Sequence, residues 1–248
     1  MPTFVRCFKK INCIGDSLTA GVFNTNGTPS SEDIPEYSYP TQLAKITGTE
    51  VSNFGQGSTT ASYDYVNSWE KFADVSGREW LSDSKKGDLY IIALGTNDIT
   101  ALGSFTGNVD DDIDLNNYAN NAPTSVGGYA RIIQRILAIQ PKAVIMCVTI
   151  PNSRNVNDSA ERTDANNKIK TIANKFPQNC YVIDLQTYAE QEGAEVAYYR
   201  DVYQNGSHNN ALGYNLRARQ YACYIDWIIE NNLSKFQNIA FIGTDYDY

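Results

Sequence analysis

The chain has 248 residues, of which 42% are hydrophobic and 12% aromatic, so it carries enough apolar side chains to bury a substantial core. Acidic residues outnumber basic ones by 28 to 20, which gives a formal net charge of −8 at pH 7, and no block of basic residues occurs. This composition argues against intrinsic disorder, and it argues against a nucleic-acid partner or an anionic membrane surface, since either would need a cationic patch.

The N-terminal segment predicts neither a signal peptide nor a membrane anchor. It carries Arg6, Lys9 and Lys10 but no apolar stretch long enough for either, and no transmembrane helix is expected elsewhere. We therefore expect a cytoplasmic protein that does not insert into membranes, while a leader already removed from the chain would instead make the protein secreted. The sequence leaves the oligomeric state open.

The five cysteines are odd in number, widely spread, and form no Cys-x-x-Cys pair. They are Cys7, Cys13, Cys147, Cys180 and Cys223. We expect buried free thiols in a reducing compartment, with no disulfide and no metal site.

Short apolar runs alternate with segments of helical period along the whole chain. The runs show no polar alternation and are bounded by Gly, Asp or Pro, which is typical of parallel strands buried on both faces. The clearest helical period is that of Val126, Tyr129 and Ile133, which Pro141 ends. In chain order we expect a strand at 11–14, a helix near 39–47, a strand at 51–54, a weaker helix around Val66, Trp69 and Ala73, a strand at 89–94, a helix at 126–137, a strand at 143–148, a helix near 163–176, a strand at 181–185 and a helix near 211–229.

This alternation predicts an α/β protein, a doubly wound three-layer α/β/α sandwich of about five parallel strands flanked by helices. We expect a single domain spanning residues 1–248, because neither a repeat nor a linker occurs. Residues 21–37 and 101–125 do not fit the alternation and are rich in small polar residues. Each follows the C-terminal end of a strand, where open α/β sheets build their binding crevice, so both are candidate walls of an active site.

A serine stands where the first expected strand ends. The sequence Ile14-Gly15-Asp16-Ser17-Leu18 places Ser17 at the turn out of that strand. Taken alone, Asp-Ser after a strand is typical of a helix cap or a turn. The triplet becomes informative only in combination with other fragments.

Two further fragments place polar side chains at comparable positions. The third expected strand ends in Gly95-Thr96-Asn97-Asp98, and His208, the single histidine, directly precedes the last expected helix. Asn and Asp also form turns, and a lone histidine is more often structural than catalytic. Neither fragment is specific by itself.

Together the three fragments resemble the SGNH hydrolases, a family of GDSL-type serine esterases, in their order, their spacing and their position relative to the strands. The resemblance runs from residue 11 to about residue 224, leaves residues 231–248 as a tail outside it, and implies a flavodoxin-like sandwich. It implies that Ser17 is the nucleophile, that Asn97 donates from its side chain to the oxyanion, and that His208 is the base.

A second sequence motif of the family implies a further oxyanion donor, but two positions in this chain could supply it. The run Asn53-Phe54-Gly55-Gln56-Gly57-Ser58 is similar to the family's block that contributes a glycine N–H. An ungapped alignment puts Ser58 at that glycine, and a one-residue gap puts Gly57 there. We favour Gly57, with Ser58 second, because the donor is a backbone N–H and the requirement is backbone shape.

The chain departs from the family pattern at the usual partner of the histidine. The family's last block is Asp-x-x-His, but Asn205 stands three residues before His208. An acceptor there holds Nδ1–H so that Nε2 can act as base, and an amide brings no charge to stabilise the imidazolium. Three outcomes are open: the Asn205 side-chain oxygen accepts from Nδ1–H, a backbone carbonyl takes the place of the Asp in a Ser-His dyad, or catalysis is lost. Deamidation of Asn205, which precedes Gly206, would be a fourth route, because it generates an acidic residue at this position.

The resemblance implies a cofactor-independent carboxylic ester hydrolase. We expect its substrate to be a small-molecule or carbohydrate ester, with short acyl groups such as acetyl on a carbohydrate as the first expectation, since no long apolar segment suggests a lipid tunnel. A lysophospholipase, thioesterase or arylesterase would use the same residues. A catalytically inactive carbohydrate-binding module derived from such an esterase is the alternative outside enzymes.

No cofactor or metal is expected. No His/Cys cluster has zinc spacing, and no glycine-rich run has the phosphate-binding pattern of a dinucleotide fold. Asp110, Asp112 and Asp114 alternate like the start of a calcium loop, but the glycine and distal glutamate of such a loop are absent. We expect a solvated loop there.

Overall fold

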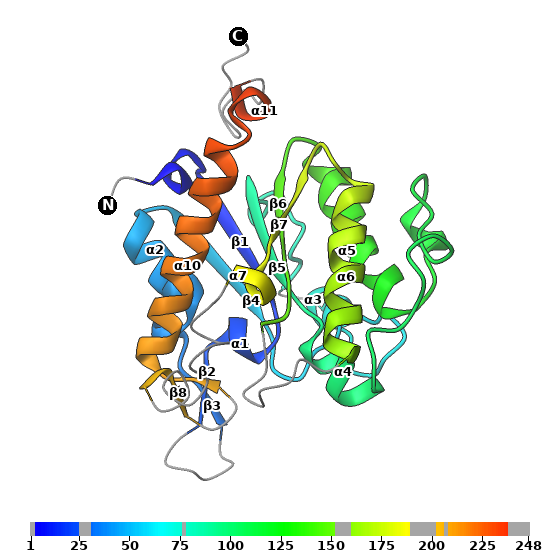
Figure 1. The fold of residues 1–248 in the computed structure, drawn as a ribbon, viewed down its shortest axis with the longest axis horizontal. Coiled ribbons are helices and arrows are strands. Elements are labelled where there is room, and N and C mark those ends of the chain that lie inside the picture. The colour runs from blue at the N-terminus through cyan, green and yellow to red at the C-terminus, as the bar shows by residue number, and fades with distance from the viewer. Residues whose placement is uncertain are drawn as a thin grey trace.

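The computed structural model describes residues 3–24, 31–75, 78–151, 160–188, 202–205 and 208–237. Its centre is one sheet of five parallel strands (Figure 1), which confirms the predicted fold class. The strands lie in the order β4 (Glu50–Gly55), β1 (Lys10–Gly15), β5 (Leu89–Ala93), β6 (Val144–Val148) and β7 (Cys180–Ile183). Because the chain passes from β1 to one side and then returns to the other, the strand order reverses at β1, and open sheets bind ligands at such a point.

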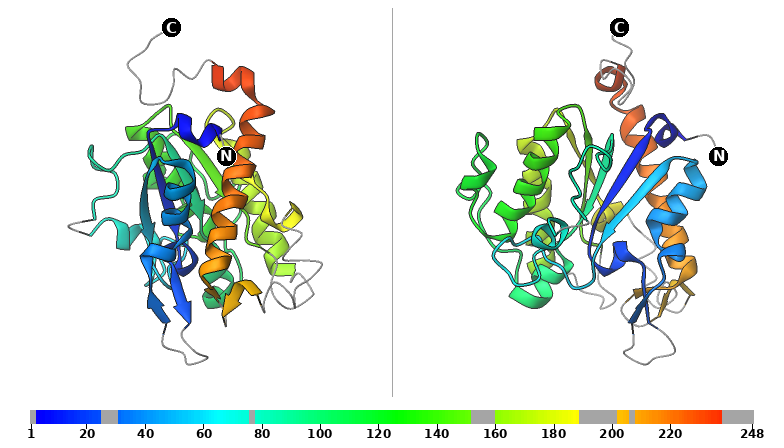
Figure 2. Two further views of the ribbon diagram at one scale, coloured as in Figure 1. Left: turned by 90° about the vertical axis from the view of Figure 1, so that its left-hand side faces the viewer. Right: turned by 180° about the vertical axis from the view of Figure 1, so that it is seen from behind.

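Helices cover both faces of the sheet, as the alternation predicted. On one face lie α2 (Tyr39–Thr47) and α10 (Ala211–Glu230), and on the other α3 (Trp69–Ala73), α5 (Ser125–Ile139) and α6 (Ala160–Lys175) (Figures 1 and 2). Successive strand residues serve the two layers alternately, so that Ile91 packs beneath α2 and α10 while Ile92 packs beneath α5. Each central strand is therefore apolar on both sides.

Two of the expectations for regular structure are wrong in part. Val66 was expected on the helix around Trp69 and Ala73, but it precedes α3 and is 81% exposed. The second strand, β4, was expected to be buried on both faces, yet its residues are half-buried or exposed because β1 is its one neighbour in the sheet. An edge position loses the cover that a central strand receives on both flanks.

Several short elements lie outside the five-stranded sheet, and the sequence did not predict them. The strands β2 (Val22–Asn24) and β3 (Ser31–Asp33) pair antiparallel, as do β8 (Gln204–Asn205) and β9 (His208–Asn209). The other elements are η1 (Phe4–Cys7), α1 (Ser17–Ala20), η2 (Pro35–Tyr37), α4 (Thr96–Leu102), η3 (Tyr118–Asn120), α7 (Leu185–Tyr188) and α11 (Leu233–Gln237). Of the expected tail, α11 is described, and residues 238–248 fall outside the described chain.

The five-residue helix α3 is fixed to α5 by a buried ion cluster. Glu70, only 1% exposed, accepts from Arg131 Nε at 2.8 Å and also pairs with Arg135, which reaches Asp74 at 2.7 Å. Trp69 donates its Nε1–H to the Phe54 carbonyl at 2.7 Å, which ties the same helix to the end of β4. Since paired charges of this kind are costly to break, α3 holds a defined position on the sheet.

The cysteines are free, as expected, but two of them are not buried. Cys13, Cys147 and Cys180 lie inside the protein, whereas Cys7 and Cys223 are exposed. Cys7 lies in η1 and Cys223 on the outer side of α10, positions that the spacing of cysteines cannot reveal. Within the described ranges, no helix is long and apolar enough to cross a membrane.

Candidate active site

Ser17 is the first residue of α1, at the C-terminal end of β1. Asp16 caps this four-residue helix, because its Oδ1 accepts from the Leu18 N–H at 2.9 Å. Gly21 ends the helix with φ +94°, a conformation that favours glycine, and its N–H donates to the Ser17 carbonyl at 3.1 Å. The turn that caps the helix therefore also presents the serine at the sheet edge.

Two glycines allow β4 and α1 to meet closely. A Cβ on Gly55 would stand 2.2 Å from the Ala20 nitrogen, and one on Gly15 would stand 2.0 Å from Thr19 Oγ1. The Gln56 N–H donates to the Gly15 carbonyl at 3.0 Å, so the segment after β4 is hydrogen-bonded beside the serine turn. Backbone contacts thus bring the residues that follow β4 close to the turn that carries Ser17.

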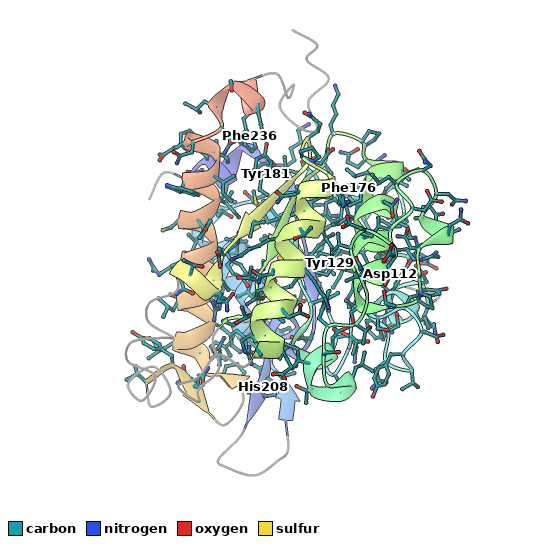
Figure 3. The ribbon with its side chains drawn as sticks, turned by 45° about the vertical axis from the view of Figure 1, so that its right-hand side comes forward. Asp112, Tyr129, Phe176, Tyr181, His208 and Phe236 are labelled. Carbon is teal, nitrogen blue, oxygen red and sulfur yellow. The ribbon has the colours of Figure 1, made fainter. Side chains whose placement is uncertain are left out.

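His208 reaches Ser17 from the other end of the chain. It lies half-buried in β9, and its Nε2 is 2.9 Å from Ser17 Oγ, a hydrogen-bond distance. The next turn is fixed by Asn210, which caps α10 by accepting from the Gly213 N–H at 3.0 Å and donates to the Val202 carbonyl at 2.8 Å. Figure 3 shows His208 at the end of the molecule where α10 begins, the end at which Figure 1 shows α1.

Asn205 pairs with His208 through the backbone. The two residues stand opposite each other in the β8–β9 register. The Asn205 side chain falls outside the described part of the chain, as do Gly206 and Ser207, so its predicted role stays a prediction.

Asn97 and Asp98 follow β5 in the first turn of α4, but they serve different purposes. Asn97 Nδ2 donates one hydrogen to the Thr59 carbonyl at 3.0 Å, which leaves its second N–H for another acceptor. The buried Asp98 accepts from the N–H groups of Ala61 and Ser62 at 2.9 and 3.1 Å. Asp98 therefore holds the segment after β4 in place. The sequence did not predict this positioning role, because the family resemblance assigns a role to the neighbouring Asn97 and none to Asp98.

The two candidate backbone donors differ from the expectation about shape. The φ angle in the left-handed region belongs to Ser58, at +62°, and not to Gly57. Ser58 is the one non-glycine residue of the described chain with this conformation. Within the described chain, neither the Gly57 N–H nor the Ser58 N–H donates a hydrogen bond, so both are available. The left-handed backbone shape therefore belongs to Ser58, the second choice, and not to Gly57, and both N–H groups are candidate donors.

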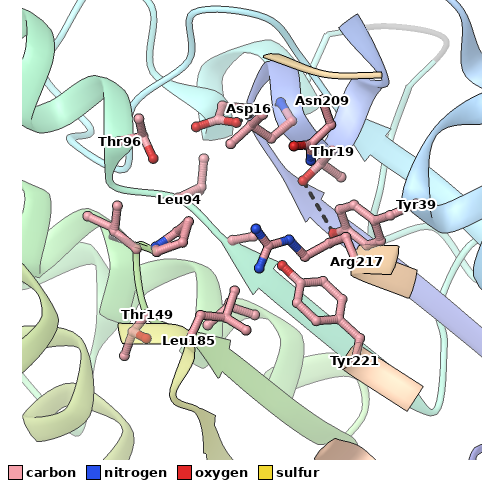
Figure 4. A pocket seen from close by; sticks show the side chains of 15 residues that line it. Asp16, Thr19, Tyr39, Leu94, Thr96, Thr149, Leu185, Asn209, Arg217 and Tyr221 are labelled. Atoms are coloured by element: carbon pink, nitrogen blue, oxygen red, sulfur yellow. Dashed lines mark hydrogen bonds between the residues drawn. The ribbon is translucent and has the colours of Figure 1, made fainter. Parts of the chain in front are cut away.

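A small cavity of about 30 Å³, mostly apolar with a few polar groups, lies beside α1. Asp16, Asn209 and Tyr221 contribute to its wall, and the guanidinium of Arg217 points into it from α10 (Figure 4). The volume suffices for a water molecule, for which Asp16, Asn209 and Arg217 are the charged and amide groups of the wall. Sequence reasoning missed Arg217, although its place between the buried Tyr214 and Tyr221 on the inner stripe of α10 was a usable signal.

Burial raises the pKa of the Asp16 carboxyl to about 7; the hydrogen bond from Leu18 lowers this pKa, and the charge of Asp98 raises it. In the unfolded chain the pKa is about 3.9. Between these values the folded protein binds more protons than the unfolded one, so this carboxyl makes folding less favourable as pH rises from about 4 to 7.

We therefore expect Asp16→Asn, which keeps an acceptor for Leu18 but cannot ionise, to melt above the wild type at pH 8. The advantage should vanish below about pH 4, where Asp16 is protonated in both states. Thermal melts of both proteins from pH 4 to 8 measure this, with Asp64→Asn, an exposed carboxyl, as the matched control. A melting difference that does not vary with pH would contradict the assignment.

The acidic loop is organised by its own hydrogen bonds. Asp112 accepts from Thr124 Oγ1 at 2.7 Å, Asp114 from Asn120 Nδ2 at 2.8 Å, and Asp110 pairs with Lys175 at 2.7 Å. The first two bonds lie within the loop, and the Asp110–Lys175 pair joins it to the end of α6. Asn121, which donates to Gln134 Oε1 at 2.8 Å, attaches the loop to the outer side of α5 (Figure 1). Over the described ranges, no group of three or more His, Cys, Asp or Glu side chains is placed to hold a metal ion.

Residues 13–216 match the model of the GDSL-like Lipase/Acylhydrolase family. No curated protein sequence matches the chain. The match includes Ser17, Asn97 and His208 and ends within α10. It covers most of the described structure.

The fold is similar to those of several solved structures. A family two carbohydrate esterase from Clostridium thermocellum, in complex with cellohexaose, matches with a TM-score of 0.63 at 17% identity, over 95% of this chain and 66% of that chain. A family two carbohydrate esterase from Cellvibrio japonicus matches with a TM-score of 0.59 at 15% identity, over 90% of this chain and 62% of that chain. A possible lipase from Chitinophaga pinensis matches with a TM-score of 0.55 at 18% identity, over 90% of this chain and 98% of that chain. At these identities the likeness establishes the fold, and the chain spans less than two thirds of the length of the two esterases.

Proposed function

This chain belongs to the GDSL-like lipase/acylhydrolase family, which makes it a carboxylic ester hydrolase, and from that premise we propose that it cleaves esters through an acyl-enzyme on Ser17. The observation that carries the proposal is the 2.9 Å separation of Ser17 Oγ and His208 Nε2. A serine hydroxyl is a weak nucleophile at neutral pH and needs an adjacent base to accept its proton. His208, as the single histidine, is the group of this chain suited to that role.

The first half of the reaction transfers the acyl group to Ser17. As His208 Nε2 accepts the hydroxyl proton, Ser17 Oγ bonds to the ester carbonyl carbon and the carbonyl oxygen becomes an oxyanion. The tetrahedral intermediate then collapses, the bond to the alcohol oxygen breaks, and the imidazolium returns its proton to that oxygen. The alcohol leaves and the acyl group stays on Ser17.

The second half releases the acid. Water attacks the acyl carbon while His208 again accepts a proton, and a second oxyanion forms. Collapse breaks the bond to Ser17 Oγ, which recovers its proton from the imidazolium. One ester and one water thereby give one alcohol and one carboxylic acid, with the enzyme unchanged.

Three donors are proposed for the oxyanion. They are the Ser17 N–H, the second N–H of the Asn97 amide, and the N–H of Gly57 or its neighbour Ser58. The Asn97 amide is held by its bond to Thr59, and the described chain contains no acceptor for the backbone groups. Fixed donors without competing partners are what electrostatic stabilisation of a developing charge requires.

The acceptor for His208 Nδ1–H is proposed among the alternatives that the sequence leaves. The Asn205 oxygen would orient the ring, and a backbone carbonyl would do so in a Ser-His dyad. With neither, the protein would be a catalytically inactive carbohydrate-binding module. This second function is considered because Asn205 stands where the family has an acidic residue.

For the substrate we propose short acyl esters, acetyl first, on a carbohydrate. The similar structures that are family two carbohydrate esterases support this choice, one of them being a complex with cellohexaose. Lysophospholipase, thioesterase or arylesterase activity is the alternative that the same residues would serve.

A fluorophosphonate probe tests the proposal directly. We expect the Ser17 oxygen to displace fluoride and form a stable phosphonate ester, detected as a mass increase on the peptide that contains Ser17. Ser17→Ala should not react, and His208→Ala should react far more slowly because its serine has no base. An unlabelled but folded wild type would contradict the enzyme assignment and favour the binding module. Rates on nitrophenyl acetate and nitrophenyl octanoate then separate short-acyl from long-acyl activity.

A further inference from the structure

A groove of about 360 Å³ adjoins the segment that carries the candidate backbone donors. Residues 56–59 form one wall, residues 66–68 another, and Lys71 and Phe72 of α3 complete it. Its volume falls within the range of about 300–1,000 Å³ that is typical of small-molecule sites. Gly57 and Ser58, the two candidate backbone donors, thus also line this groove.

The walls of the groove are tied to each other. The Thr60 N–H donates to the Asn67 carbonyl and the Trp69 N–H to the Thr60 carbonyl, both at 3.0 Å. The buried Glu70 cluster holds α3 from behind. The groove is therefore preformed, which lowers the entropy cost of filling it.

Two features indicate that the groove is a binding site: one of its residues has a strained backbone, and another has a hydroxyl group without a hydrogen-bond partner. Ser58 holds a left-handed φ of +62°, which costs a non-glycine residue energy and tends to persist at functional sites. Ser68 is 1% exposed and its Oγ has no hydrogen-bond partner. It occupies the N-cap of α3 without capping it. A buried hydroxyl without a partner is unfavourable, and a hydroxyl group of a bound molecule would relieve it.

Lys71 brings a positive charge to the groove of an acidic protein. Its Nζ lies 5.1 Å from the centre of the Tyr63 ring, and it forms no ion pair within the described ranges. The nearest acidic residues on its own helix, Glu70 and Asp74, are both engaged by Arg135. The charge of Lys71 is therefore available to a ligand.

We propose that this groove binds the alcohol part of the ester and selects a hydroxylated, negatively charged alcohol, such as a sugar that carries a carboxylate. The inference rests on the proposed function of Ser17. An acetyl group is far smaller than the groove, so the larger alcohol part is the fitting occupant. Side chains of Gln56, Ser68 and Asn67 offer hydrogen bonds to sugar hydroxyls, and Lys71 meets the carboxylate.

The test compares two acetyl esters that differ at one carbon. The methyl glycosides of mono-O-acetyl galacturonic acid and mono-O-acetyl galactose carry a carboxylate or a hydroxymethyl group at carbon 6. We expect the wild type to show a higher kcat/KM for the acidic ester, and Lys71→Met to lower the ratio of the two values about threefold to fivefold. Lys142→Met, an exposed lysine two residues before β6, is the control and should keep the ratio.

A second variant and a binding measurement keep the inference separate from catalysis. Ser68→Ala should lower kcat/KM for both sugar esters relative to nitrophenyl acetate by about threefold to tenfold, the effect of one hydrogen bond. In a Ser17→Ala background, calorimetry with methyl galacturonide should show weaker binding once Lys71 is Met. An unchanged substrate ratio in folded Lys71→Met overturns the groove assignment, whereas loss of probe labelling at Ser17 with charge-dependent binding retained overturns the proposed chemistry alone.

Discussion

Replacing Ser17 by Ala, or His208 by Ala, is expected to lower kcat for nitrophenyl acetate by about 10³-fold to 10⁶-fold. The first change removes the proposed nucleophile, Ser17 Oγ, and the second removes the proposed base, whose Nε2 lies 2.9 Å from that oxygen. Because the two groups would act in one proton transfer, the double variant should be no slower than either single variant. Steady-state rates of the three variants measure this.

The loss must be separated from unfolding. Ser84→Ala, an exposed serine near the start of β1, is the matched control and should retain wild-type kcat. Circular dichroism should give all variants the wild-type spectrum. Residual activity of Ser17→Ala within tenfold of the wild type would contradict the assignment of the nucleophile.

The same assay addresses Asn205. If its oxygen orients His208, Asn205→Ala should lower kcat; if a backbone carbonyl does so, kcat should stay at the wild-type value. Mass spectrometry of the active protein's peptide around Asn205 and Gly206 tests the deamidation route, which needs a species heavier by the exchange of NH₂ for OH.

Asn97→Ala should lower kcat about 10²-fold to 10³-fold with little change in KM. The amide would contribute mainly in the transition state, when the carbonyl oxygen carries charge, so its loss raises the barrier more than it weakens substrate binding. Rates and melting temperatures of Asn97→Ala and Asn97→Asp measure the effect; the second variant keeps the shape and loses the donor.

The control for Asn97 must account for its bond to Thr59. Losing that bond alone should cost about 1 kcal/mol of folding stability, which the melting temperature reports. Asn120→Ala removes an exposed amide bonded to Asp114 in the acidic loop and should leave kcat as it is. A kcat within twofold of the wild type for folded Asn97→Asp would exclude the amide from the oxyanion site.

The regular core of the fold could be predicted because burial on two faces leaves a strong mark in the sequence. The apolar run at 89–94 and the helical period ending before Pro141 correspond to β5 and α5. The pairs β2–β3 and β8–β9 could not be predicted, since strands of three and two residues carry too little apolar pattern to register. The partial exposure of β4 follows from strand order, which local sequence does not contain.

The candidate active site likewise has a part that the sequence predicts and a part that it does not. The fragments around Ser17, Asn97 and His208 could be recognised because together they resemble the motifs of a known family, the first two directly after expected strands and the third directly before the last expected helix. Their distances depend on the close approach at Gly55 and on the turn before α10, and these are properties of the folded chain. The unpaired hydroxyl of Ser68 could not be foreseen, because a serine before a helix is ordinarily its cap.

The hydrogen bond between Ser17 and His208 joins residues 191 positions apart in the chain. During synthesis Ser17 leaves the ribosome first, and His208, its proposed base, follows only after all five sheet strands have been made. A nascent or truncated chain that ends before β9 would contain Ser17 without His208, its proposed base. Under the proposed chemistry, ester hydrolysis would therefore begin only after β9 has been made and has folded back onto α1, so that activity would report the pairing of the two distant segments.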